Sequence, residues 1–301
     1  MVNEKNTQVW YHADDFGVSP AQSEKILACF REGALNSISI LPNVPDLSGA
    51  HALLERTDPE RRIRRVLHLN FVEGRPLAGA ERTSLLTDDK GYFDKSFVKL
   101  FIWSRTLNGK RRQALKIQLC AEIRAQLRAV TSEHDFGITA VDSHQHYHMI
   151  PIVFDCLMQV LAEEEFKPLT IRQVRIPVDP LKPVFSVRGG KIRAVNLVKW
   201  MILKSTAKRN CKILSKKGIE VPVFFGIFYT CEMKYEVVKR LLPAYIRYAD
   251  KSGASLELMF HPGSLSAEYE LLDGRRGELW EFYASDNRFF EAECLRMLKT
   301  D

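Results

Sequence analysis

The chain has 301 residues, of which 46% are hydrophobic and 27% are charged, with a net charge of +7. This composition is typical of a globular protein with a large core and excludes a disordered chain. No run of about 18 apolar residues is present, which excludes a membrane-spanning helix. The amino terminus has no secretory pattern, so we expect a soluble, cytoplasmic protein.

The positive charge is concentrated in two stretches, residues 95–128 and 188–217. Two interpretations remain open: solvated helix faces, or a surface for nucleic acid, an anionic membrane or a polyanionic substrate. No helix-turn-helix, zinc-finger or RNA-binding signature is present, so we expect no specific nucleic-acid partner. The six cysteines form no C-x-x-C pair, and we expect buried free thiols.

The first half of the chain alternates short strands with helices. Residues 8–12 form a predicted buried strand, and Ser19, Pro20 and Gly33 are typical of the cap, first position and end of a helix. The runs SISIL and VLHLNF predict two further strands. Residues 113–131 show helical periodicity, and ITAVDSH then predicts another strand.

The second half repeats this order. Pro151 begins a predicted helix, and a strand follows near TIRQVRIP. Residues 190–217 mix Trp200 and other apolar side chains with many lysines and arginines, which predicts a basic amphipathic helix. VPVFFGIFYT, KYEVVKRLLPAYIRYADKSG and ASLELMFHPG predict a strand, a helix and a strand, and residues 287–299 predict a final helix.

Apolar strands that alternate with helices predict an α/β fold with a mainly parallel, covered sheet. The side chains capable of chemistry follow strand ends: DDFG, His68, DSHQHYH and HPG. A (β/α) barrel collects its catalytic groups at the carboxyl ends of its strands. We therefore predict such a barrel as a single domain over residues 1–301, with a basic helical insert near 188–217.

Asp14 and Asp15 are adjacent in H-A-D-D-F-G, a pattern that also suits an ordinary turn. An extended strand would point them to opposite faces, so both serve one site only if the strand ends or kinks there. Further along, extended geometry would place four side chains on one face: Asp142, His144, His146 and His148. Buried imidazoles without partners are costly, so we interpret this row as metal binding.

Single histidines elsewhere carry weaker signals. His68 and His261 could each be a core histidine, but beside the cluster they become candidates for the same site. The remaining histidines lie outside the motif positions or in a presumed helix or loop and are expected to be structural: His12, His51 and His134.

Taken together, these motifs resemble the YdjC-like carbohydrate deacetylases, a family that includes chitooligosaccharide deacetylase and hopanoid-associated homologues. The resemblance runs from HADDFGVSP through HLNFVEGRPL and LLTDDKGYF to DSHQHYHMIP and MFHPG, most of the chain. It implies a distorted (β/α) barrel related to NodB-type polysaccharide deacetylases, and a homodimer. Gln145 stands where a third consecutive histidine is frequent in the family.

By motif, the resemblance implies one divalent metal ion held by Asp15, His68 and His144. It also implies Asp14 as the general base, His261 as the general acid and Arg175 as an arginine that orients Asp14. Two nitrogens and one oxygen suit zinc, cobalt or nickel, whereas family members are often associated with magnesium. Zinc or magnesium is the expected metal, with cobalt and nickel as alternatives.

The implied reaction removes the acetyl group of an N-acetylated sugar, an oligosaccharide or glycan precursor, and releases acetate and an amino sugar. One cation flanked by histidine and aspartate could instead serve a phosphoesterase or another amidohydrolase. An alternative of another class is a noncatalytic protein that binds anionic surfaces or nucleic acid.

Residues 188–217 also leave two roles open. Their basic amphipathic character suits peripheral contact with the inner membrane face, where a lipid-linked sugar could be the substrate. The same helix could instead pack on the barrel or form a dimer contact. The sequence leaves open which sugar is used and whether it is free or lipid-linked.

Overall fold

A computed structural model of the chain describes residues 7–187, 191–265 and 278–299. Its strands are β1 (Val9–Phe16), β2 (Ser37–Ile40), β3 (Arg64–Leu69), β4 (Ala140–Ser143), β5 (Gln173–Val174), β6 (Val223–Phe225) and β7 (Leu256–Phe260). They form one sheet in the order β5-β4-β3-β2-β1-β7-β6, and every neighbouring pair is parallel.

The sheet curls until its two edges approach each other. Gln173 in β5 forms a parallel bridge with Glu220, which lies just before β6. The Val174 N–H donates to the Glu220 carbonyl at 3.1 Å, and the Glu220 N–H donates to the Arg172 carbonyl at 2.9 Å. The two edges therefore meet at the amino-terminal end of the strands, and the predicted distorted (β/α) barrel is confirmed.

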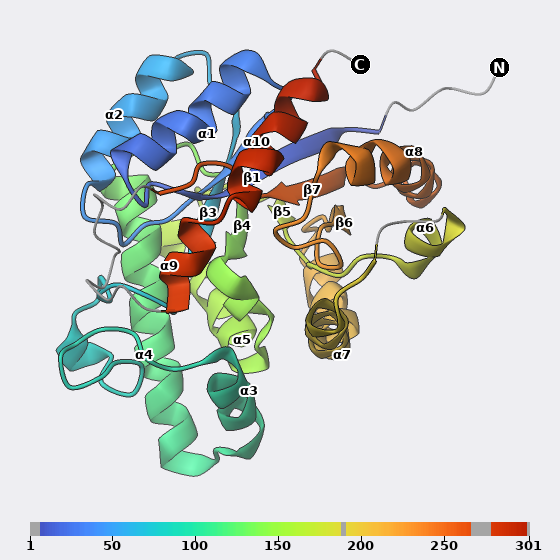
Figure 1. Ribbon diagram of the computed structural model, residues 1–301. Helices are drawn as coiled ribbons and strands as arrows, with labels where there is room; N and C mark the ends of the chain where they lie inside the picture. Colours follow the sequence, from blue (N-terminus) through green and yellow to red (C-terminus); the bar gives the residue numbers. More distant parts are fainter. Residues whose placement is uncertain (1–6, 188–190, 266–277, 300–301) are drawn as a thin grey trace.

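Helices surround the curled sheet (Figure 1). The α-helices are α1 (Pro20–Glu32), α2 (Leu47–Thr57), α3 (Phe97–Thr106), α4 (Gly109–Arg128), α5 (Pro151–Val160), α6 (Leu181–Ser186), α7 (Ala194–Lys216), α8 (Tyr235–Ser252), α9 (Glu278–Tyr283) and α10 (Asn287–Met297). Shorter turns of helix are η1 (Ala80–Arg82), η2 (Ala129–Glu133), η3 (His144–Met149) and η4 (Glu164–Phe166). No helix among the described residues has the length and apolar character needed to cross a membrane.

Several predicted helix boundaries are confirmed. Ser19 accepts a hydrogen bond from the Gln22 N–H at 3.1 Å, and Pro20 occupies the first turn of α1, where its missing N–H costs nothing. The predicted basic helix corresponds to α7, and the predicted last helix corresponds to α10. The six cysteines are free, as predicted, although Cys211 and Cys231 are only partly buried.

The strands are buried on both faces, but the two faces differ in chemistry. The outer face is apolar and includes Ile38, Ile40, Leu67, Leu69 and Leu258. The inner face carries buried polar side chains, which include His12, Ser37, Ser39, His68, Asp142 and Glu257. Arg64 of β3 contacts Glu257 of β7 at 2.8 Å although two strands separate them, so these side chains meet inside the curl. The expectation of apolar strands therefore holds for the outer face and is wrong for the interior.

Candidate active site

A kink in β1 brings its two adjacent acids to one site. Asp15 has a φ of 68°, in the left-handed region that side-chain-bearing residues rarely adopt. The register between β1 and β2 shifts at the same place, between Ala13 and Phe16. Arg288 helps to hold the kink, because its Nη2 donates to Asp15 Oδ2 at 2.8 Å. The strand therefore bends at Asp15. This bend is the condition under which both acids can serve one site.

β4 ends at Ser143, and the chain then turns sharply instead of continuing through the histidines. Gln145 and His146 have φ values of 47° and 62°. The Ser143 hydroxyl closes the turn by accepting the His148 N–H at 2.8 Å. The prediction that four side chains share one strand face is therefore wrong for Asp142, His144, His146 and His148.

These histidines have different surroundings. His148 is fully buried, with Nδ1 2.6 Å from the Ser143 hydroxyl and Nε2 2.8 Å from the Arg175 carbonyl oxygen. His146 lines a cavity, and burial holds its pKa well below the usual value, so the ring is neutral. His144 alone turns toward Asp15.

Asp15, His68 and His144 form a group that we call the outer cluster. Asp15 Oδ1 lies 3.0 Å from His144 Nδ1 and 3.5 Å from His68 Nε2. One ligand atom from each of the three residues lies within 4.8 Å of the other two. Ligands at about 2.1 Å from a tetrahedral zinc ion are separated by about 3.4 Å, which is close to these spacings.

The electrostatics of the outer cluster favour a cation. Burial disfavours protonation of His68, but Asp142 and Asp15 outweigh burial and raise its pKa to about 10. Asp15 and Glu73 likewise outweigh burial at His144 and raise its pKa to about 9. His68 Nε2 is buried without a hydrogen-bond partner, an arrangement that is costly unless something else binds there. These residues fit a bound divalent metal ion.

A second group, the inner cluster, lies deeper in the barrel and contains His12, Asp14, Asp142, Arg175 and Glu257. Arg175 donates two hydrogen bonds to Asp14, from Nη1 to Oδ2 at 2.9 Å and from Nη2 to Oδ1 at 2.8 Å. Its Nε donates to Glu257 at 2.5 Å, and Nη2 lies 2.8 Å from Asp142 Oδ2. One buried guanidinium therefore forms ion pairs with three carboxylates, and Arg64 provides a second cation at Glu257.

His12 was expected to be structural, and the structure places it inside the inner cluster. Its Nδ1 lies 2.6 Å from the Ser37 hydroxyl, and its Nε2 lies 2.6 Å from the Ser39 hydroxyl. Ligand atoms of His12, Asp14 and Asp142 are also close enough together to hold a metal ion. Here, however, both ring nitrogens have partners and Arg175 supplies the positive charge, so the outer cluster fits a metal better.

Asp142 connects the two clusters. Its Oδ1 lies 2.7 Å from His68 Nδ1, so it fixes the ring that presents Nε2 to Asp15. Its Oδ2 accepts a hydrogen bond from the Ser39 hydroxyl at 2.6 Å. A carboxylate behind a metal-binding histidine commonly sets the orientation of the ring, so Asp142 has the position of such a support.

His261 follows β7 and lies beside Asp14, with 3.8 Å between His261 Nε2 and Asp14 Oδ2. Its backbone N–H donates to Glu291 at 2.5 Å, which ties the strand end to α10. Together with Asp14, Asp15 and His144 it lines a cavity of about 490 Å³. Apolar residues from α7, α3 and α9 form much of the rest of this cavity: Val195, Val198, Ile202, Phe97 and Phe282.

Sequence reasoning missed several residues that support the site. Glu73 Oε1 accepts a hydrogen bond from the Tyr283 hydroxyl at 2.5 Å and lies 3.1 Å from His144 Nε2. Glu73 lies inside the motif HLNFVEGRPL, and Glu257 is an acid within the apolar run LELMF, so both left a signal in the sequence. Tyr283 and Arg288 lie in the last two helices, where no sequence motif marked them as candidates.

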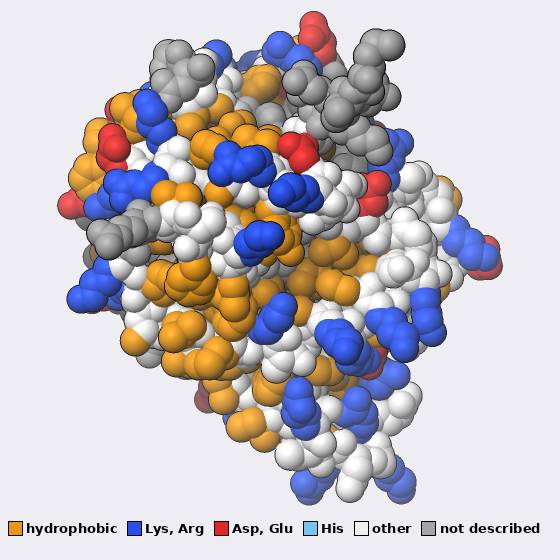
Figure 2. Space-filling model, turned by 90° about the vertical axis from the view of Figure 1, so that its right-hand side faces the viewer, with side chains coloured by type: hydrophobic (Ala, Val, Ile, Leu, Met, Phe, Trp, Pro, Cys, Tyr) orange, Lys and Arg blue, Asp and Glu red, His pale blue; other side chains and the backbone are white. Residues whose placement is uncertain are grey.

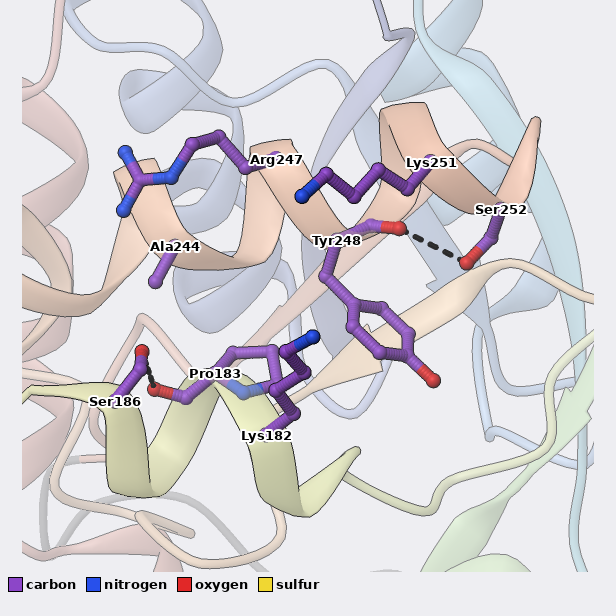
Figure 3. Close-up of a pocket in the computed structure, with 8 residues that line it drawn as sticks. All are labelled: Lys182, Pro183, Ser186, Ala244, Arg247, Tyr248, Lys251 and Ser252. Atoms are coloured by element: carbon purple, nitrogen blue, oxygen red, sulfur yellow. Dashed lines mark hydrogen bonds between the residues drawn. The ribbon is translucent and has the colours of Figure 1, made fainter.

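A separate cavity of about 280 Å³ lies between α6 and α8 (Figure 3). Lys182, Arg247 and Lys251 line it, and its described lining includes no acid or histidine. The hydroxyls of Ser186 and Ser252 donate to carbonyl oxygens of their own helices. This cavity lacks the acids and imidazoles needed for hydrolysis, whereas the cavity at the outer cluster contains them and is the candidate active site.

The fold and the site define a curled parallel (β/α) barrel that gathers carboxylates and imidazoles at the carboxyl ends of its strands, where barrel enzymes carry their active sites. Comparison with known proteins agrees with this class. The chain belongs to the YdjC-like protein family, which matches residues 8–293. The resemblance drawn from the motifs is confirmed.

Named relatives are similar over much of their length. A carbohydrate deacetylase of Geobacillus stearothermophilus is 31% identical and aligns with 75% of this chain and 85% of that protein. A carbohydrate deacetylase of Xenopus laevis is 26% identical over 94% of this chain and 89% of that protein. A chitooligosaccharide deacetylase of Yersinia enterocolitica is 29% identical over 53% of this chain and 57% of that protein.

A solved structure has the same fold. It is a candidate cellobiose-phosphate cleavage protein of Enterococcus faecalis V583, with a TM-score of 0.65. The alignment covers 98% of this chain and 93% of that chain at 18% identity. At this identity the likeness supports the barrel fold alone.

Proposed function

We propose that this chain is a carbohydrate deacetylase, which hydrolyses the acetamide of an N-acetylated sugar and releases acetate and an amino sugar. The observation that carries the proposal is that Asp14, Asp15, His144 and His261 line one cavity, and that His68 completes the outer cluster behind it. Family membership and the named deacetylase relatives support the same reaction.

Asp15, His68 and His144 would hold one divalent metal ion, either zinc or magnesium, with cobalt or nickel as alternatives. One oxygen and two nitrogen ligands suit zinc, cobalt or nickel well. Such an ion would polarise the acetyl carbonyl and offset the charge that develops on its oxygen. His68 would be fixed for this role by Asp142, and His144 by Glu73.

Asp14 would act as the general base that accepts a proton from the attacking water. Burial disfavours a charged carboxylate, but Arg175 outweighs burial and holds the pKa of Asp14 well below its usual range. Asp14 is therefore ionised and free of a proton before the reaction. The two bonds from Arg175 also fix the direction of the carboxylate.

His261 would act as the general acid. Its ring lies in the same cavity as Asp14, so a proton acceptor and a proton donor flank one site. When the carbon–nitrogen bond breaks, the departing sugar nitrogen needs a proton to leave as an amine. An imidazole that carries a proton at Nε2 can supply it.

The proposal is tested by measuring acetate release from N-acetylglucosamine oligomers, with the protein as purified, after chelation, and after each metal is restored. We expect release that stops on chelation and returns with metal. His261→Gln should lower kcat by roughly 10²- to 10⁴-fold. His51→Gln, the same change at a histidine of α2 outside the cavity, should leave kcat unchanged. Folded, metal-loaded protein that releases no acetate from these oligomers or from alkyl N-acetylglucosaminides would refute this function.

A further inference from the structure

The cavity at the outer cluster has an apolar side that continues to the surface, and this feature indicates a substrate class. The inference rests on the proposed function. Val195, Val198 and Ile202 of α7 line the cavity, and Val195 is 61% exposed to solvent. Aliphatic side chains offer no hydrogen bonds to sugar hydroxyls, so this surface suits an apolar group attached to the sugar.

The outer surface of α7 continues this apolar area. Leu197 and Met201 do not line the cavity and are 44% and 50% exposed. Residues 194–216 include lysines and an arginine but no acidic residue. α3, whose Phe97 lines the same cavity, exposes Val98 and Ile102 and also has no acidic residue. Two helices that border the cavity thus combine exposed apolar side chains with positive charge.

Figure 2 shows the side of the molecule on which α6, α7 and α8 lie in Figure 1. Hydrophobic and basic side chains are interspersed across this face, and acidic side chains are few. A large exposed apolar area usually marks a place where another surface binds. Mixed with lysines and arginines, it is typical of proteins that lie on an anionic membrane.

The exposed side chains of α7 belong to a helix that is firmly attached to the barrel. Trp200 turns inward, where its Nε1 donates to the Asp179 carbonyl at 2.9 Å. Its ring stacks on Phe228 with 5.5 Å between ring centroids. Trp200 is therefore a packing residue, and the aliphatic side chains of α7 make up its exposed apolar surface.

We propose that the substrate is an N-acetylated sugar carried on a membrane lipid, and that α7 docks on an anionic membrane with the lipid chain against Val195, Val198 and Ile202. A second copy of this chain is a poorer occupant of the surface. Two α7 helices placed face to face would bring like charges together, because the helix has no acid to offset them. An anionic lipid surface neutralises that charge.

The first test compares two glycosides with one sugar: methyl and dodecyl N-acetylglucosaminide, each with mixed phosphatidylcholine and phosphatidylglycerol vesicles. The kcat/KM for acetate release should be roughly 100-fold higher for the dodecyl glycoside than for the methyl glycoside. Equal values would overturn the lipid-linked substrate and leave the deacetylase function in place. Absence of acetate from both glycosides and from the soluble oligomers would refute the function and this inference together.

The second test uses the double variant Leu197→Ser, Met201→Ser, with Phe289→Ser as the control. Phe289 is 57% exposed and lies on α10, away from the cavity. In the double variant, binding to phosphatidylglycerol-containing vesicles and turnover of the dodecyl glycoside should each fall roughly tenfold. Turnover of the methyl glycoside should not change in the double variant. The control variant should match the wild type in vesicle binding and in turnover of both glycosides.

Three results would overturn the docking surface. The wild type could fail to sediment with these vesicles, or the double variant could sediment as well as the wild type. Alternatively, light scattering could show that the wild type is a dimer and the double variant a monomer, while neither protein binds vesicles. That result would assign the α7 surface to a second copy of the chain.

Discussion

The outer and inner clusters both contain histidine and acidic side chains but differ in the hydrogen-bond partners and charges around those side chains. In the inner cluster both nitrogens of His12 have hydroxyl partners, and Arg175 supplies a fixed positive charge. In the outer cluster His68 Nε2 has no hydrogen-bond partner, and carboxylates raise the pKa of both imidazoles. Arg288 also binds Asp15 in the outer cluster, so the difference lies in the imidazole nitrogen that remains without a partner, and this makes the outer cluster the better candidate for a metal site.

Removal of a ligand from the outer cluster should have the largest effect. His144→Ala should lower kcat by about 10⁴-fold, because charge on the acetyl oxygen would lose its stabilisation. Metal content, measured by mass spectrometry, should fall below one ion per chain. Asp15 keeps its bond to Arg288 and Glu73 keeps its bond to Tyr283, so the variant should remain folded.

His148→Ala is the matched control, because it makes the same change four residues away. His148 has partners on both ring nitrogens, so its loss should lower the free energy of unfolding by about 1–3 kcal/mol and leave one metal ion per chain. If His148→Ala loses the metal and His144→Ala retains it, the outer cluster is not the metal site.

In the inner cluster, Arg175→Met should lower stability in addition to the activity lost when Asp14 is no longer oriented. Asp14, Asp142 and Glu257 would remain buried without their shared cation. Such loss of one partner costs about 3–5 kcal/mol in the free energy of unfolding, which urea titration at neutral pH would measure. Stability equal to that of the wild type would show that the three carboxylates do not need Arg175.

The grouping of the outer cluster has a clearer basis in the sequence than that of the inner cluster. Asp15, His68 and His144 each follow or end a strand, and parallel strands bring those positions to one edge of the barrel. The predicted row of histidines was wrong because the chain turns after Ser143, and left-handed φ values at Gln145 and His146 have no clear sequence signature. Period-two alternation predicts side-chain direction only while a strand continues.

The resemblance implied that Arg175 orients Asp14, but the other charge pairs of the two clusters could not be predicted from the sequence. Arg175 and Glu257 are 82 positions apart, and Arg288 and Asp15 are 273 apart. Such contacts form only when the sheet curls and the last helices pack against it. Glu257 lies within the apolar run LELMF and Arg64 and Arg65 lie before VLHLN, but the sequence does not say which charges meet.

Glu73 offers a finer test of the outer cluster, because it lies behind His144 and not among the three candidate ligands. Glu73→Gln keeps the shape of the side chain but removes the charge that raises the pKa of His144. Loss of such a supporting group typically weakens metal binding by about 10- to 100-fold. Competition with a chelator of known affinity would measure this. Glu81→Gln in η1 is the control, and equal affinity in both variants would exclude Glu73 from the metal site.

The smallest expected effect is the pH dependence that Glu257 gives to the inner cluster. Burial favours the neutral acid, but Arg175 and Arg64 outweigh it and lower the pKa of Glu257 to about 2. The ordinary value is 4.5, so as the pH falls the unfolded chain takes up this proton first. The stabilisation from the charged group is thus complete above about pH 5 and is lost as the pH falls toward 2.

Between pH 7 and pH 4, we therefore expect the free energy of unfolding of the wild type to fall by about 1 kcal/mol more than that of Glu257→Gln. Urea titration at both pH values would measure the difference, with Glu60→Gln as the control because Glu60 is largely exposed. If Glu257→Gln and the wild type lose the same stability, Glu257 is not held as an anion.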